Sequence, residues 1–152
     1  MSNVLAGIGL GQLEVLKSRV SKRRLNFTLY SESLAEIPGL SFQTEIKQSL
    51  GNRWLTVLKI GPSQISMNPR IIFENLKEIK IESRPAWKPM HMQPLFSDYE
   101  LVTINKKTIN SRDLYFQSIC LPSGSELTEF DIDLVCSQIK KTFYGAQFER
   151  SL

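Results

Sequence analysis

The residue types best suited to ligand chemistry gather in one short segment, Glu82 to Pro94. It holds three prolines, an arginine, a lysine, a tryptophan and the only histidine of the chain. Proline removes a backbone donor and favours extended geometry in the residue before it, so neither a helix nor a central strand can run through this segment. Irregular backbone that carries such side chains is a common setting for binding sites. We therefore predict that this segment, the 82–94 loop, is a binding loop.

Four side chains of the 82–94 loop are candidate ligand contacts, and most have a plainer alternative. The imidazole of His91 can hydrogen-bond hydroxyl or phosphate groups, but a lone histidine is usually structural or solvated. Arg84 suits a phosphate or a carboxylate, or is an ordinary surface arginine beside a strand. Trp87 and Lys88 could flank a bound ligand, although a core anchor is the favoured interpretation for Trp87.

Apolar spacing predicts the elements that hold the loop in place. Apolar residues recur at three- and four-residue intervals from Leu5 to Ile37. They predict a long helix with at most one break, which begins after Ser2 and Asn3 and ends near Ile37. Residues 54–60 are rich in β-branched and apolar types and predict a strand that is covered on both faces.

Further elements follow along the chain. A proline after Asn68 predicts the start of a second helix. Residues 81–87 predict a short strand, residues 97–110 a polar loop, residues 111–119 a short helix and residues 120–122 a brief strand. Thr128 is the predicted cap of a last helix with the apolar positions Phe130, Ile132, Leu134, Val135, Ile139 and Phe143. Strands alternating with helices at this spacing predict a small α/β fold (α+β, two layers), a small sheet with flanking helices.

Composition excludes several classes of protein. With 152 residues, 41% of them apolar and 22% charged, the chain fits one globular domain. Cys120 and Cys136 lack the spacing of a zinc site or a disulfide framework, so reduced and buried thiols are expected. No apolar run is long enough for a membrane span and no secretory leader is visible, so a cytoplasmic protein is expected.

The predicted first helix carries a basic run and a glycine pattern. A net charge of +4 indicates no nucleic-acid binding without a concentrated patch, and this run is the one candidate. A small nucleic-acid-binding module is therefore an alternative, but no recognition motif accompanies the run, and a solvated helix face is favoured. The glycines lack the spacing of a phosphate loop, so we expect close packing against another element. The residues concerned are Lys17, Arg19, Lys22, Arg23 and Arg24 for the run and Gly7, Gly9 and Gly11 for the glycines.

Four blocks of the sequence, in order, resemble the C-terminal domain of the DegT/DnrJ/EryC1/StrS family of pyridoxal-phosphate-dependent sugar aminotransferases. Residues 2–13 (SNVLAGIGLGQL) look like the start of the linker helix of the family, and residues 51–56 (GNRWLT) like its first C-terminal strand. Residues 82–94 (ESRPAWKPMHMQP) are similar to its substrate-side loop, and residues 120–125 (CLPSGS) to its final strand and turn. Together the blocks cover nearly the whole chain.

The resemblance implies a fold, an activity and a cofactor. The fold would be the small C-terminal domain of a fold-type-I aminotransferase, residues 38–152, after a linker helix, residues 1–37. Family enzymes are homodimers that use a lysine Schiff base with pyridoxal phosphate to transfer an amino group, usually from glutamate, to a nucleotide-linked keto sugar. The 82–94 loop most resembles members that aminate a 4-keto-6-deoxy sugar, such as the UDP-N-acetylbacillosamine-pathway enzymes.

The resemblance also implies substrate contacts and one missing part. The contacts would be His91, Arg84, Trp87, Lys88, Asn52 and Arg53. The Schiff-base lysine of the family and its acidic partner lie in a larger N-terminal domain, which we expect to be absent here. The chain alone is therefore expected to bind no cofactor productively and to catalyse nothing. Three alternatives stay open: a dehydratase branch in which histidine replaces that lysine, the nucleic-acid module, and a standalone interaction domain that self-associates through its first helix.

Overall fold

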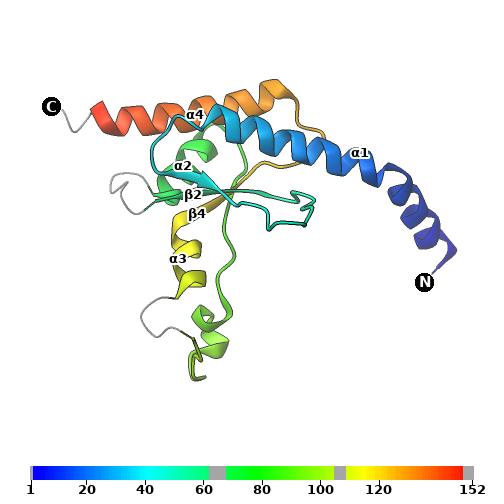
Figure 1. The fold of residues 1–152 in the computed structure, drawn as a ribbon, viewed down its shortest axis with the longest axis horizontal. Coiled ribbons are helices and arrows are strands. Elements are labelled where there is room, and N and C mark those ends of the chain that lie inside the picture. The colour runs from blue at the N-terminus through cyan, green and yellow to red at the C-terminus, as the bar shows by residue number, and fades with distance from the viewer. Residues whose placement is uncertain (1, 62–67, 105–108, 149–152) are drawn as a thin grey trace.

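The computed structural model describes residues 2–61, 68–104 and 109–148, and within them it shows a four-stranded sheet with helices packed on one face (Figure 1). The predicted α/β class with flanking helices is confirmed. The elements are α1 (Asn3–Ser33), β1 (Leu40–Phe42), β2 (Thr56–Ile60), α2 (Pro69–Glu78), β3 (Arg84–Pro85), the 3-10 turns η1 (Met90–Met92) and η2 (Pro94–Phe96), α3 (Asn110–Gln117), β4 (Ser118–Leu121) and α4 (Glu129–Phe148). Residues 105–108 of the predicted polar loop lie outside the described residues.

Helix α1 begins where it was predicted and ends earlier. The hydroxyl of Ser2 accepts a hydrogen bond from the Leu5 amide at 3.3 Å, which caps the first turn. The helix continues without a break to Ser33, and Figure 1 shows it bending near its N-terminus. It ends there because the amides beyond it bond in tighter turns, such as Ile37 to the carbonyl of Leu34 at 3.2 Å. These turns bring both Leu34 and Ile37 into the core.

The sheet has the strand order β1-β2-β4-β3, and each pair of neighbours is antiparallel. Successive residues of β2 face opposite sides, so Leu58 and Ile60 enter the core while Val57 and Lys59 face away from it. The second side is only half-buried, so the predicted cover of both faces is incomplete.

Two predicted strands need correction. The sequence prediction omits β1, whose three residues are too few to show a pattern. The strand expected over residues 81–87 is reduced to Arg84 and Pro85, because proline donates no hydrogen bond to a ladder.

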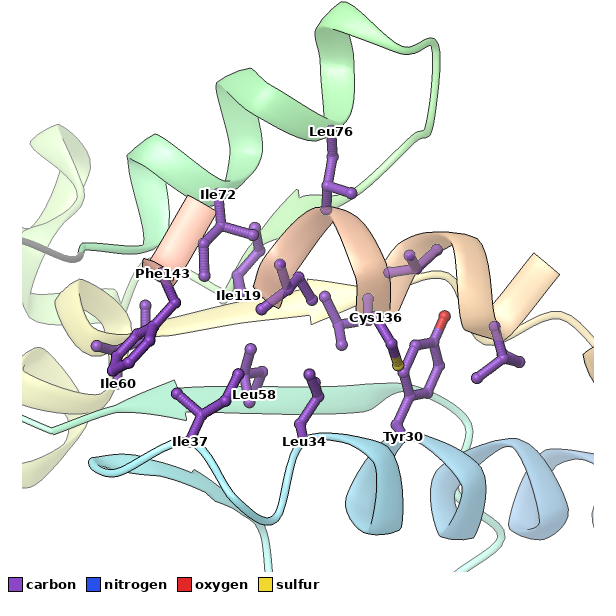
Figure 2. Packing of buried hydrophobic residues seen from close by; sticks show 14 residues of the cluster. Tyr30, Leu34, Ile37, Leu58, Ile60, Ile72, Leu76, Ile119, Cys136 and Phe143 are labelled. Atoms are coloured by element: carbon purple, nitrogen blue, oxygen red, sulfur yellow. The ribbon is translucent and has the colours of Figure 1, made fainter. Parts of the chain in front are cut away.

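One hydrophobic core joins α1, α2 and α4 to the sheet (Figure 2). The phenol of Tyr30 lies in it and donates a hydrogen bond to the carbonyl of Pro122 at 3.1 Å, so its buried hydroxyl is satisfied. Cys120 and Cys136 are free and buried, as predicted, and burial raises the pKa of both thiols. Figure 2 labels Tyr30, Leu34, Ile37, Leu58, Ile60, Ile72, Leu76, Ile119, Cys136 and Phe143.

The predicted cap of helix α4 is confirmed, and so are most of the apolar positions that were predicted for it. The hydroxyl of Thr128 accepts from the Asp131 amide at 3.2 Å, and the Asp131 carboxylate accepts from the Thr128 amide at 2.8 Å. The prediction is wrong for Phe130 and Leu134, which are exposed, because they fall outside the buried stripe. That stripe consists of Ile132, Val135, Cys136, Ile139 and Phe143. Within the described part of the chain, no helix has the length and apolar character to cross a membrane.

Arginines of the basic run bind the chain's own loops. Arg19 donates to the hydroxyl of Ser125 at 2.8 Å and pairs with the carboxylate of Glu126. Arg23 donates to the carbonyl of Trp54 at 2.5 Å. Arg19 and the two lysines of the run are exposed, as the favoured interpretation of a solvated face expects. That interpretation is wrong for Arg23 and Arg24, which are half-buried.

The loop of residues 43–55 leads into β2, and the carboxylate of Glu45 is the group to which most of its contacts converge. Arg24 donates to its carboxylate through Nη1 at 2.6 Å and Nη2 at 3.3 Å, and the Gly51 amide donates to it at 2.9 Å. Arg53 adds an ion pair, with its Nε 3.5 Å from Oε1 of Glu45. The hydrogen bond from Arg24, followed by that from Gly51, lowers the pKa of Glu45 from 4.5 to about 2. The 43–55 loop is therefore tied to α1 by charge-assisted hydrogen bonds.

This lowered pKa predicts a loss of stability in acid. A carboxyl group whose pKa is lower in the folded chain stabilises it above the unfolded value of 4.5, and that contribution disappears as the pH falls toward about 2. Glu45→Gln should lower the free energy of unfolding at neutral pH and reduce its fall over this acid range. Urea denaturation at a series of pH values measures both effects. The matched control is Glu36→Gln, an exposed glutamate that forms no ion pair with the described residues. Equal pH profiles for the two variants would contradict the prediction.

Candidate functional site

The structure divides the six predicted site residues among three places. Trp87 and Lys88 line an open groove of about 870 Å³ on the side of the sheet away from the core. Asn52 and Arg53 line an adjoining cavity of about 370 Å³, whose wall also includes Trp87. Arg84 and His91 line neither space.

The groove lies over the side of the sheet that the core leaves free. Its floor comes from β1, β2 and β4, one wall from α3, and the other from residues 86–93 of the 82–94 loop. Because this loop is rich in proline, it crosses the sheet edge without joining it for more than two residues. The lining residues are Ser41, Phe42, Gln43, Thr44, Val57, Lys59, Ala86, Trp87, Lys88, Pro89, Met90, Gln93, Ser111, Leu114, Tyr115 and Ser118.

A polar row crosses the floor of the groove. In the antiparallel register Lys59 lies opposite Ser41 on one side and Ser118 on the other. Residues directly opposite one another share a face of the sheet, so the ammonium group and two hydroxyls stand on the same side. All three residues line the groove. The row can offer hydrogen-bond donors and positive charge to an anionic ligand.

Two tryptophans meet where the groove joins the smaller cavity. The ring centroids of Trp54 and Trp87 are 5.7 Å apart, and the ring planes make an angle of 34°. Both remain largely exposed, at 60% and 63%, so the interpretation of Trp87 as a core anchor is wrong. Trp54 is fixed by Asn52, whose Oδ1 accepts from its amide at 3.1 Å, and by Arg23, which binds its carbonyl.

Arg53 is held inside the wall of the smaller cavity. Its φ of 50° lies in the left-handed region that non-glycine residues rarely adopt. Its guanidinium donates to the carbonyl of Gln43 at 2.8 Å and stacks over Phe27, with Cζ 3.7 Å from the ring centroid. With Glu45 also paired to it, the guanidinium is occupied by the protein itself.

Arg84 and His91 lie apart from both spaces. Arg84 pairs with Glu82 at 2.6 Å, and both side chains are about three-quarters exposed, at 77% and 75%. His91 belongs to η1, and its Nε2 is buried without a hydrogen-bond partner among the described residues. The structure therefore brings together only part of the predicted contact set.

Sequence reasoning did not identify Trp54, Lys59 or Tyr115 as members of a site. Trp54 and Lys59 fall in the predicted strand 54–60, whose side chains were expected to be covered by other elements. Tyr115 falls in a predicted short helix that has no clear apolar pattern. Strand alternation could have indicated Lys59, because a lysine between Leu58 and Ile60 must face away from the core.

The described residues do not fit pyridoxal phosphate. That cofactor needs a lysine amine and an acidic partner for its pyridine nitrogen in one pocket. The groove is lined by Lys59 and Lys88 but by no carboxylate, and the smaller cavity is lined by Glu45 but by no lysine. Glu45 is also already bound by two arginines. No chemical step that uses the cofactor can be derived from these residues.

Comparison with known proteins identifies relatives over nearly the full chain. The model of the DegT/DnrJ/EryC1/StrS aminotransferase family matches residues 1–140. EpsN of Bacillus subtilis, named as a pyridoxal phosphate-dependent aminotransferase, is 39% identical over 99% of this chain and 38% of its own length. A GDP-perosamine synthase of Caulobacter vibrioides is 28% identical over 91% of the chain and 36% of its own length. The chain therefore spans less than two fifths of these relatives.

Solved structures share the fold. DesI, determined in the presence of its TDP-sugar product, superposes with a TM-score of 0.82 at 20% identity, over 99% of this chain and 38% of DesI. The sugar aminotransferase Spr1654 of Streptococcus pneumoniae gives 0.81 at 18% identity, over 100% of this chain and 38% of its own. The family match extends over most of the sequence, and its members are pyridoxal-phosphate-dependent enzymes. The chain belongs to the DegT/DnrJ/EryC1/StrS aminotransferase family.

Proposed function

We propose that this chain is the C-terminal portion of an enzyme that transfers an amino group from glutamate to a nucleotide-linked 4-keto-6-deoxy sugar. The observation that carries the proposal is the family match over residues 1–140. Relatives named GDP-perosamine synthase, from Caulobacter vibrioides, Escherichia coli and Vibrio cholerae, support a nucleotide-linked sugar as substrate. A cytoplasmic location, where such soluble precursors are used, is part of the proposal.

The chain would contribute a linker helix, residues 1–37, and a small domain, residues 38–152. The Schiff-base lysine and the acidic partner would come from a larger domain that precedes them. Support comes from the short share of each relative that the chain spans and from the lack of a lysine and carboxylate in one described pocket. Pyridoxal phosphate would then act in the complete enzyme and not in this chain alone.

Among the predicted contacts, Trp87 and Lys88 have the best support as substrate residues, because they line the groove. Asn52 and Arg53 would act by shaping the cavity wall, since Asn52 fixes Trp54 and the guanidinium of Arg53 is bound by other protein groups. His91 would contact substrate only after a movement of η1 that exposes its buried, unpartnered Nε2, and Arg84 would require release from Glu82.

The complete enzyme should aminate its sugar at the expense of glutamate. Genomic DNA upstream of the Met1 codon should continue in frame into a lysine-bearing domain. The protein read from that frame, supplied with pyridoxal phosphate, glutamate and a nucleotide-linked 4-keto-6-deoxy sugar, should form amino sugar and 2-oxoglutarate in equal amounts. Mass spectrometry and a coupled assay for 2-oxoglutarate measure the two products.

Other outcomes decide between the branches of the family. Consumption of the sugar without glutamate would show the dehydratase branch, and the aminotransferase proposal would be wrong. A stop codon close upstream would favour a standalone domain that works with a separate partner chain.

The chain alone should not form a Schiff base at one defined lysine. Incubation with pyridoxal phosphate followed by borohydride should give only scattered, substoichiometric labelling of surface lysines, because no described pocket combines a lysine with an acidic partner. Peptide mapping of the reduced adduct measures the labelling. One-to-one modification of a single lysine would contradict this expectation.

We also propose that the N-terminal half of α1 is a self-association surface, as in a homodimer. Its apolar residues are exposed, and a methyl group added at Gly7 or Gly11 would meet no atom within 4 Å, so the expected packing partner is not in the described part of the chain. The exposed residues are Val4, Leu5, Ile8, Leu10, Leu13 and Leu16.

Light scattering should show a concentration-dependent dimer that Leu5→Glu and Leu13→Glu convert to monomer without loss of helicity. A charge on this face leaves the core untouched, because both side chains lie outside it. The control is Lys17→Glu, a charge change on the same helix outside the apolar set. A wild-type chain that stays strictly monomeric at high concentration would refute the proposal.

The nucleic-acid alternative has less support. Arg19, Arg23 and Arg24 each bind a carboxylate or a backbone carbonyl of the chain itself. The basic run therefore offers fewer free charges to phosphates than its sequence suggests, and no nucleic-acid partner is part of the proposal.

A further inference from the structure

The 82–94 loop receives little support from the sheet that it borders. Its ladder with β4 consists of Arg84 and Pro85, and the chain then runs away from the sheet (Figure 1). Hydrogen bonds of 3.0 Å in η1 join residues 89–93 to one another. Such bonds shape the loop, but they do not fix its position relative to the rest of the domain. A contact from outside the loop is needed for that.

The stacked indole rings supply such a contact. The ring centroid of Trp87 lies 5.7 Å from that of Trp54, a separation typical of favourable aromatic pairs. Trp87 is largely exposed and lies outside the core, so core packing does not hold its ring. Pro85 and Pro89 on either side restrict the backbone but leave the side-chain torsions of Trp87 free. The neighbouring indole can therefore select one orientation of Trp87.

Trp54 can serve as a fixed point because its own backbone is bound at both ends. Its carbonyl accepts a hydrogen bond from Nη1 of Arg23 on α1 at 2.5 Å, and its amide donates to Oδ1 of Asn52 at 3.1 Å. Directly before it, Arg53 is held at a φ of 50° and donates to the carbonyl of Gln43 at 2.8 Å. A continuous path of contacts thus leads from α1 through Trp54 to the 82–94 loop.

We propose that Trp54 is a positioning residue for the 82–94 loop, which it orients through Trp87, and that Arg23 fixes Trp54 to α1. Trp54 itself is 60% exposed and outside the core, so a contribution to core stability does not account for its place. The effect on the reaction rests on the proposed function, in which Trp87 and Lys88 face the substrate. The effect on the loop does not depend on it.

Fluorescence of the purified 152-residue chain tests the contact directly. The two tryptophans of the chain are the two members of the pair, so a change at Trp54 leaves Trp87 as the only emitter. Trp54→Phe retains an aromatic ring and should keep the anisotropy of Trp87 emission high. Trp54→Ala removes the ring and should lower the anisotropy toward that of a mobile side chain.

Hydrogen exchange measures the same effect in the backbone. In Trp54→Ala the η1 amides of Met92 and Gln93 should exchange roughly twofold to tenfold faster, the factor that corresponds to loss of an aromatic pair. Trp54→Phe should restore most of the protection. The amides of Lys80 and Ile81, bonded at the end of α2 just before the loop, are internal controls and should not change.

Matched variants separate the positioning role from a general loss of stability. Arg23→Gln should speed exchange of the η1 amides, whereas Lys22→Gln removes the same charge from an exposed neighbour and should not. Phe116→Ala removes an equally exposed ring, 60%, from a pair with Tyr115 on α3 and should also leave these amides unchanged. Circular dichroism and urea denaturation check that each variant is folded.

The complete enzyme tests the consequence for substrate. Trp54→Ala should raise the KM for the keto sugar several-fold with little change in kcat, because a loop that is mobile before binding must be ordered on binding. Trp54→Phe should restore the KM. Equal anisotropy and equal exchange in Trp54→Ala and Trp54→Phe would overturn the positioning role. A more mobile loop with an unchanged KM would support that role and contradict the substrate contacts of the proposed function.

Discussion

The ion pair between Arg24 and Glu45 is the interaction on which the candidate site depends. It ties the 43–55 loop to α1, and this loop carries the residues that shape both the smaller cavity and the tryptophan pair. Arg53 completes the arrangement by binding Glu45, the Gln43 carbonyl and the ring of Phe27. The unusual backbone angle of Arg53 is thus maintained by several contacts at once, as strained residues in rigid sites generally are. Helix α1 is therefore also the frame of the 43–55 loop.

The two faces of the small sheet form different parts of the molecule, the hydrophobic core and the groove. One face forms the core with α1, α2 and α4, and the alternation of β2 places Lys59 on the other. The proline-rich loop and α3 rise at the border of this second face and make it a groove instead of an open surface. Because side chains of a strand alternate, substitutions can change the groove without disturbing the core.

The helices and their caps could be predicted from the sequence more accurately than the candidate site. Helix α1, helix α2 and the Thr128 cap follow from apolar period and capping residues, which are local signals. The site depends on contacts between distant segments, and spacing carries no information about those. Trp87 looked like a core residue because tryptophan is mostly buried, yet its partner Trp54 lies on another exposed loop. The arginines of α1 looked solvated because their acceptors are backbone carbonyls and a carboxylate far along the chain.

The strand order has a consequence for how the chain is made. β2 pairs with β4, so its second neighbour is synthesised only after α2, the 82–94 loop and α3 have emerged. Closing such a long loop costs entropy before any pairing compensates it, which slows folding. Until Leu121 leaves the ribosome, Leu58 and Ile60 lie on a strand that lacks this neighbour and part of its apolar cover. Co-translational aggregation should therefore start from β2, and a chaperone that shields this strand would protect the nascent chain.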